Sequence, residues 1–321
     1  MRTNLAHGVC LVPRLQLTLF SIVVATAAVD AVWVQAGLFD VDAKGYGAIA
    51  LLSILFAAGG VFYGRIRKEE RLAAMLIGTS FLLGMSASFS LLNYLLLTIA
   101  GQRIDAPLAA LDRAMGVDWP AMMRLTAQHP LVGVGLQLAY TSVLPQIALL
   151  VAILGWHGNH ERIYALCLSV SAGAAISIAI WTVAPSFGAF TIYDLPADVS
   201  SHLSLALDGQ YAKELVTLLA QGPGHVSPSD AKGLIGFPSF HAVLALYVVW
   251  YARELAFVRW FALGLNCIVL VATPIEGGHH VVDVVAGIGV AALGVLFANA
   301  LVRRAFDASA ARAITIQTAV I

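Results

Sequence analysis

The chain has 321 residues, of which 60% are hydrophobic and 11% charged, and its mean hydropathy is +0.86. An average soluble domain is about half apolar and about a quarter charged, so this composition excludes an ordinary soluble domain and favours a membrane protein. Eighteen basic residues balance eighteen acidic ones, which gives no support to a nucleic-acid partner or to a polybasic attraction to anionic lipid.

Apolar segments long enough to cross a bilayer recur along the chain. A helix needs about 20 mostly apolar residues to cross about 30 Å of hydrocarbon. The sequence therefore predicts an all-α, polytopic membrane protein with about eight transmembrane helices. The first segment contains Asp30 and lacks a clean cleavage site, so we interpret it as a retained span. The eight candidates, of which the sixth and seventh are short, are 17–37, 45–63, 74–100, 131–156, 163–184, 234–251, 260–275 and 281–302.

The basic residues predict the orientation of these spans. An even number of spans puts both termini on one side of the membrane. Twelve of the eighteen Lys and Arg residues fall on that side, with tight clusters at 65–71 and 303–304, and six fall on the other. Because basic residues accumulate in cytoplasmic loops, we expect both termini in the cytoplasm and a multi-pass protein of the cell inner membrane.

Two long polar stretches then lie on the outer side. The first, 101–130, is predicted to be an amphipathic helical segment near the interface, because Leu108, Leu111, Met115, Trp119 and Met123 recur at helical spacing. The second, 185–233, contains turn signals around another amphipathic piece near 203–220. A connection of that length in a compact protein is usually functional or disordered.

Polar groups gather in two segments where hydrocarbon should dominate. One is Gly-Phe-Pro-Ser-Phe-His-Ala at 236–242, at the start of the sixth span. The other is Thr-Pro-Ile-Glu-Gly-Gly-His-His-Val-Val-Asp at 273–283, between the seventh and eighth spans. Ionisable residues at membrane depth are costly and indicate a functional site. The alternation of spans puts both segments on the outer face, where they can meet.

The residue types in these segments suit an anion. Pro238 is suited to the first turn of a helix, and the free N–H groups at a helix start favour a phosphate. The pair Gly277–Gly278 would let the backbone approach a ligand closely before the next helix start. We therefore expect two helix N-termini to converge on one anion.

Two adjacent histidines precede an aspartate in the second segment. His279 and Asp283 are four residues apart, so both lie on one helix face, where the carboxylate can orient the imidazole and stabilise its cation. His280 is three residues from Asp283 and could compete for it. The spacing alone does not decide between the two histidines.

The Pro-Ser-Phe-His-Ala segment at 238–242, followed by Gly-Gly-His-His-Val-Val-Asp-Val-Val-Ala-Gly at 277–287, resembles the second and third signature motifs of the type 2 phosphatidic acid phosphatase (PAP2) superfamily. The likeness is greatest to the bacterial branch related to inositol phosphorylceramide synthases. It covers mainly residues 233–287 and is weaker at 112–121 and 139–146. The resemblance implies a PAP2-like helical bundle, a nucleophile at His279, and second-motif residues at Ser239 and His241.

The chain also departs from the family pattern. Ala272 and Thr273 stand where the third motif usually opens with Ser-Arg, and no convincing first motif is present. The usual phosphate-binding cations are therefore missing. Lys232 is the best replacement because it lies so close to the second motif; the other candidates are Arg113, Arg124 and Lys213.

The implied chemistry needs no metal or other cofactor. His279 would attack phosphorus to give a phosphohistidine, Asp283 would orient it, and His241 would protonate the leaving oxygen. Ser239, Gly278 and Lys232 are the predicted substrate contacts. The expected substrate is a lipid phosphate ester within the membrane lipids, and water or a lipid hydroxyl would resolve the intermediate. Hydrolysis and head-group transfer share all of these residues, and the sequence does not indicate an oligomeric state.

An alternative from a different functional class stays open. The side chains of His241, Glu276, His279 and Asp283 would also suit a transporter, an ion pathway or a metal site. For the domain organisation, we expect the first three spans and the outer amphipathic segment in residues 1–130. The PAP2-like catalytic core is then expected in 131–321, with its motifs at 236–242 and 273–287.

Overall fold

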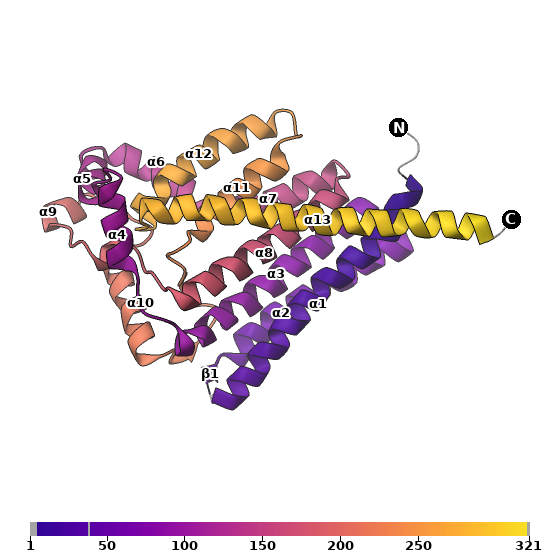
Figure 1. Cartoon of the computed structure of the whole chain (residues 1–321), viewed down its shortest axis with the longest axis horizontal. Helices are drawn as coiled ribbons and strands as arrows, with labels where there is room; N and C mark the ends of the chain where they lie inside the picture. The colour runs from indigo at the N-terminus through magenta and orange to yellow at the C-terminus, as the bar shows by residue number, and fades with distance from the viewer. Residues whose placement is uncertain (1–4, 38, 320–321) are drawn as a thin grey trace.

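The computed structural model describes the backbone of residues 5–37 and 39–319, and the side chains of 15–37 and 39–304. The described chain is almost entirely helical, as predicted (Figure 1). The predicted cytoplasmic ends of the chain, residues 1–4 and 320–321, lie outside the described residues. In chain order, the elements are α1 (Leu5–Gly37), β1 (Asp40–Val41), α2 (Ala43–Phe62), η1 (Tyr63–Arg67), α3 (Glu70–Leu96), η2 (Leu97–Ile99), α4 (Asp105–Ala114), α5 (Trp119–Gln128), α6 (Pro130–Thr141), α7 (Val143–Trp156), α8 (His160–Val183), η3 (Ala189–Thr191), α9 (Ala197–Ser200), α10 (Gly209–Gln221), β2 (His225–Val226), α11 (Phe240–Ala252), α12 (Val258–Glu276) and α13 (Val281–Ala319).

Within the described residues, six helices are long and apolar enough to cross a membrane, namely α1, α2 with η1, α3 with η2, α8, α12 and α13. The count rises to seven if α6 and α7, which meet at a 50° bend, form one span. The bend precedes Pro145, whose ring and missing N–H oppose a continuous helix. The predicted sixth span is the 13-residue helix α11, about 20 Å long. The predicted total of eight full spans is therefore not confirmed.

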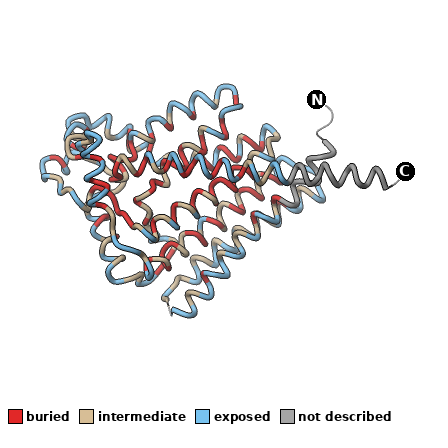
Figure 2. Tube along the Cα trace, viewed as in Figure 1, coloured by how far each residue is buried: buried red, intermediate tan, exposed pale blue. Residues whose placement is uncertain are grey.

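Helix α8 lies at the centre of the bundle and packs against α3, α11 and α13. Its sequence is apolar on all sides, as expected of a helix surrounded by protein, and Leu166, Cys167 and Leu168 are fully buried. Helices α1 and α2 pack on α3 at one edge and expose most of their surface (Figure 2). Because that surface carries apolar side chains such as Leu51 and Leu55, it suits contact with lipid.

The connections between helices gather at two ends of the bundle. At one end, which we call the site end, β1 pairs in parallel with β2, Asp40 opposite His225. At the opposite end, Arg162 forms an ion pair with Glu254, joining the α7–α8 and α11–α12 connections. Helices α4, α5, α9 and α10 lie together at the site end, away from the C-terminal end of α13 (Figure 1). The two long polar stretches therefore share one end, as the alternation of spans predicted.

The predicted amphipathic segment at 101–130 consists of two helices rather than one. Gly116, with φ of +82°, separates α4 from α5. The break divides the predicted apolar stripe: Trp119 and Met123 are buried in a cluster with Tyr140 and Ile275, whereas Leu111 and Met115 are exposed. Helix α5 thus packs against the protein; the predicted helical character of the segment is confirmed, and its position near the membrane interface stays a prediction.

Candidate active site

His279 lies between α12 and α13, and its ring is held from one side. Nδ1 is 2.9 Å from the carbonyl oxygen of Gly236 and 3.3 Å from Oδ2 of Asp283. Both neighbours are acceptors, so Nδ1 carries the proton. Nε2 is then the acceptor nitrogen of the ring, and the Ser239 hydroxyl faces it at 3.5 Å as its donor. The His279 ring is thus oriented by contacts on both of its nitrogens.

Asp283 resolves the competition between the two histidines that the spacing left open. Its Oδ2 meets the ring of His279, but it accepts a hydrogen bond from the backbone N–H of His280 at 2.8 Å. The His280 ring is buried elsewhere, with Nδ1 3.7 Å from Oδ2 of Asp112. The structure therefore brings Asp283 to the His279 imidazole and not to that of His280.

Ser239 links the two motif segments. Its backbone N–H donates to the Asp283 carbonyl at 3.0 Å, and its Oγ accepts from the N–H of Ala242 at 3.4 Å, which makes it the N-cap of α11. Pro238, expected in the first helical turn, precedes this cap instead. Gly287 of α13 faces the same point, since a Cβ there would lie 2.5 Å from the Ser239 carbonyl oxygen. Glycine thus permits the close approach of α11 and α13.

His241, in the first turn of α11, faces the same region. Its ring stacks on Tyr140 with centroids 4.1 Å apart, and its Nδ1 is 3.3 Å from the Tyr140 hydroxyl. The centroids of His241 and His279 are 6.5 Å apart. The weaker family likeness at 139–146 contains Tyr140, but nothing in the spacing of the sequence singled it out.

The two helix starts do not offer their N–H groups as expected. Asp112 of α4 accepts from the N–H of Val281 at 2.8 Å and from that of Val282 at 3.0 Å. Ser239 accepts at the start of α11. The expectation of free N–H groups converging from both helices was therefore wrong, because an aspartate of the protein occupies the α13 terminus.

Gly278 makes a close approach, but to the chain itself. Its φ is +61°, and a Cβ there would collide with the Phe190 ring. Its carbonyl oxygen accepts from the N–H of Ala189 at 2.6 Å. Its contact with substrate stays a prediction.

Lys232 lies at the rim of the site end. It forms an ion pair with Glu214, and its ammonium lies 4.9 Å from the centroid of the Tyr211 ring. The hydrogen bond from Lys232 lowers the pKa of Glu214 below its ordinary value. Of the other candidate cations, Arg113 donates to the Tyr193 hydroxyl at 2.9 Å, and Arg124 is exposed. A phosphate contact of Lys232 stays a prediction.

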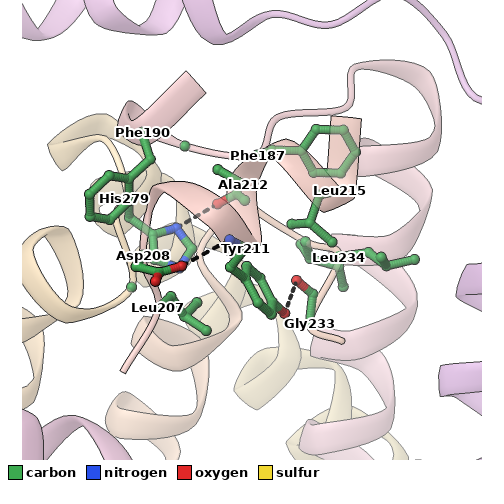
Figure 3. A pocket seen from close by; sticks show the side chains of 14 residues that line it. Phe187, Phe190, Leu207, Asp208, Tyr211, Ala212, Leu215, Gly233, Leu234 and His279 are labelled. Carbon is green, nitrogen blue, oxygen red and sulfur yellow. Dashed lines mark hydrogen bonds between the residues drawn. The ribbon is translucent and has the colours of Figure 1, made fainter. Parts of the chain in front are cut away.

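Two cavities lie at the site end, and His279 lines the one shown in Figure 3. His279, Tyr211 and Asp208 line the smaller one, whose volume is about 30 Å³, room for a water or two. A larger cavity of about 520 Å³ shares Phe190 and Asp208 with it and is also lined by Lys213. The two cavities thus adjoin at these two residues, and His279 lines only the smaller one.

A segment that we call the outer strap, residues 188–208, lines part of both cavities. Glu276 holds its far end: Oε2 accepts from the N–H of Ala206 at 3.1 Å, and the Glu276 carbonyl accepts from the N–H of Leu207 at 3.0 Å. Trp119 packs edge-on against Phe190, with centroids 4.9 Å apart.

Among the described side chains, no three His, Cys, Asp or Glu residues form a group that could hold a metal ion.

Comparison with known proteins agrees with this geometry. Residues 106–297 match the family model described as PAP2 superfamily, which is more than half of the chain. No curated protein and no solved structure matches it. The match begins within α4, so it includes α4 and α5, which the predicted division at residue 130 grouped with the N-terminal helices. The chain belongs to the PAP2 superfamily.

Proposed function

We propose that this PAP2 superfamily member is a membrane-embedded enzyme that hydrolyses or transfers the phosphate ester of a lipid through a phosphohistidine at His279. One observation carries the proposal. The Nδ1 side of His279 is held by Gly236 and Asp283, while the Nε2 lone pair meets only a long, 3.5 Å hydrogen bond from Ser239, on a ring that lines a cavity. This is the arrangement of an activated nucleophile with its orienting carboxylate.

In the first step, Nε2 of His279 attacks phosphorus and the bond from phosphorus to the leaving oxygen breaks. Asp283 stabilises the positive charge that the ring acquires. His241, as an imidazolium, gives its Nε2 proton to the leaving oxygen. In the second step, water or a lipid hydroxyl attacks phosphorus, His241 takes its proton, and His279 leaves as neutral imidazole.

Tyr140 supports the charged form of His241 in this scheme. The Nδ1–H group of the imidazolium donates a hydrogen bond to the Tyr140 hydroxyl oxygen, 3.3 Å away. The phenol ring stacked at 4.1 Å stabilises the cation through its π face. His241 can therefore return to the same tautomer after each proton transfer.

Ser239, Gly278 and Lys232 are the proposed substrate contacts. The Ser239 hydroxyl accepts from its own helix and donates to Nε2 of His279 over a long 3.5 Å; when Nε2 attacks phosphorus, this hydrogen can turn to a phosphate oxygen instead. Lys232 has two further N–H donors besides the one that meets Glu214, so it can bind an anion while it keeps that ion pair. The large cavity beside the site has room for the polar part of a substrate or acceptor, which suits head-group transfer of the inositol phosphorylceramide synthase kind as well as hydrolysis.

We further propose that the site end faces the outer side of the cell inner membrane, because the smaller share of the basic residues lies there. No comparable observation favours an ion or metal carrier, since the described His and carboxylate side chains do not gather as a ligand set. Because attack by His279 and proton transfer by His241 require no Lewis acid, we expect chelation to leave turnover unchanged.

The test is direct. The purified protein is incubated in detergent with a panel of lipid phosphate esters, with and without an alcohol acceptor, and the products are identified by mass spectrometry. We expect release or transfer of phosphate and an acid-labile phosphoenzyme that His279→Ala abolishes. If His280→Ala abolishes the phosphoenzyme while His279→Ala leaves it in place, the nucleophile assignment is wrong.

A further inference from the structure

Asp112 lies more than 160 residues before the third motif, yet it contacts the start of the helix that carries Asp283. Its side chain is almost fully buried, and each of its oxygens accepts one hydrogen bond from the first turn of α13: Oδ2 from Val281 at 2.8 Å and Oδ1 from Val282 at 3.0 Å. A carboxylate in this place also opposes the positive end of the helix dipole. Asp112 is therefore the N-terminal cap of α13, supplied by α4.

The same carboxylate faces the histidine that the proposed chemistry does not use. Nδ1 of His280 is 3.7 Å from Oδ2 of Asp112, and within the described part of the chain neither ring nitrogen of His280 has a hydrogen-bond partner. The backbone N–H of His280 donates to Oδ2 of Asp283 at 2.8 Å. The backbone N–H groups of the short turn from His279 to Asp283 are thus bonded by two carboxylates, those of Val281 and Val282 by Asp112 and that of His280 by Asp283.

The orientation of the nucleophile depends on this turn. The Oδ2 atom of Asp283 that receives the His280 N–H is also the atom 3.3 Å from Nδ1 of His279. If the turn moved, the carboxylate and the imidazole would lose their alignment together. A displacement of about 1 Å at a reacting group can cost about a hundredfold in rate.

We propose that Asp112 is a positioning residue for the phosphoryl-transfer step, acting through the first turn of α13 on the pair His279 and Asp283. The inference rests on the proposed function and deepens it: the anion at this helix start belongs to the protein and orients the nucleophile, while the substrate phosphate binds on the Ser239 side of the ring. Asp112 itself touches neither the substrate nor the reacting atoms.

The test compares Asp112→Ala with a matched cap variant, Asp118→Ala. Asp118 caps α5 by accepting from Ala121 at 2.9 Å, and it is distant in the chain from both motifs. Phosphoenzyme formation is followed in the pre-steady state with an excess of a lipid phosphate ester. The amplitude of the initial burst then counts active molecules, and the rate of the burst reports the chemical step. We expect Asp112→Ala to keep the amplitude and KM but to slow the burst at least about tenfold. Asp118→Ala should change none of these.

Asp112→Asn provides the second measurement, because the amide keeps one acceptor oxygen. It should recover part of the lost burst rate, and it serves in place of the alanine variant if that variant does not fold. A merely structural role would instead lower the amplitude and leave the rate per active molecule unchanged, which would overturn the inference. If the wild-type protein forms no phosphoenzyme, the proposed function fails and the inference with it; a normal wild-type burst with an unchanged Asp112→Ala rate overturns the inference alone.

Discussion

At the scale of single residues, His241 is placed for a role that a substrate series can isolate. Its ring is fixed by stacking on Tyr140 and lies across the site from His279. A group in that position can protonate a leaving oxygen without taking part in the attack on phosphorus. Removing His241 should therefore lower the rate more for a substrate with a poorer leaving group.

We expect His241→Ala to lower turnover of an alkyl phosphate by about 10²–10⁴, because an alkoxide leaves slowly without a proton. An aryl phosphate with an activated leaving group should keep its rate within about tenfold. Tyr140→Phe keeps the stacked ring and removes the hydroxyl. It should also lower turnover of the alkyl phosphate more than that of the aryl phosphate, but by a smaller factor than His241→Ala does. The measurement is a plot of kcat against leaving-group pKa. An equal loss for both substrates would contradict the assignment of His241 as the acid.

At the scale of elements, the approach of α11 to α13 positions both motif segments. Gly287 lies where a Cβ would come within 2.5 Å of the Ser239 carbonyl oxygen, and that oxygen belongs to rigid backbone. Gly289, two residues further along the same helix, has open space where its Cβ would be, with nothing within 4 Å. The two glycines form a matched pair for substitution.

Gly287→Ala should lower the thermal midpoint of the detergent-solubilised protein and reduce turnover, since α11 must move away from α13. Gly289→Ala should leave turnover unchanged and raise stability by up to about 1 kcal/mol, because alanine is the better helix former. Thermal unfolding and kcat measured on both variants check this. Equal behaviour of the pair would show that the α11–α13 contact does not position the site.

If a phosphate binds at His279 as proposed, we expect the outer strap to shift, because the cavity there holds only about 30 Å³. Glu276 fixes the strap through Ala206 and Leu207. We expect Glu276→Ala to speed hydrogen exchange at residues 203–208 about tenfold, since a hydrogen bond to a charged group contributes about 1.5–3 kcal/mol. Glu276→Gln keeps the acceptor and should exchange nearly as the wild type does. Unchanged exchange in Glu276→Ala would mean that other contacts hold the strap.

The sequence predicted the parts of this site that depend on spacing and on the alternation of spans. His279 lies two residues before α13 rather than on the helix, so the prediction of a shared helix face was wrong, but the four-residue spacing does bring its ring to Asp283. The alternation of spans put residues 236–242 at the same end of the bundle. Tyr140 and Asp112 could not be found in this way, because their contacts join distant helices through side chains and follow no period. The split between α4 and α5 depends on one residue, Gly116, whose left-handed conformation a spacing argument does not see.

At the scale of the whole molecule, the bundle has two distinct ends. The site end is closed by β1 with β2 and by the bond from the Gly101 N–H to the Thr182 carbonyl at 2.8 Å. The opposite end is joined by the ion pair of Arg162 with Glu254. The connections at 63–69 and 253–257, which carry most of the basic residues of the internal loops on the predicted cytoplasmic side, lie at that opposite end.

The last prediction concerns which end faces outward. Ser201 is exposed at the site end and Glu69 is exposed at the opposite end, so each accepts a cysteine without disturbing the core. With Cys10, Cys167 and Cys267 replaced, a membrane-impermeant maleimide should label Ser201→Cys in intact cells and Glu69→Cys only after permeabilisation, because basic connections stay in the cytoplasm. Activity toward a lipid phosphate supplied from outside should follow the same sidedness. Labelling of Glu69→Cys in intact cells, with Ser201→Cys protected, would reverse the topology and place the phosphoryl-transfer site in the cytoplasm.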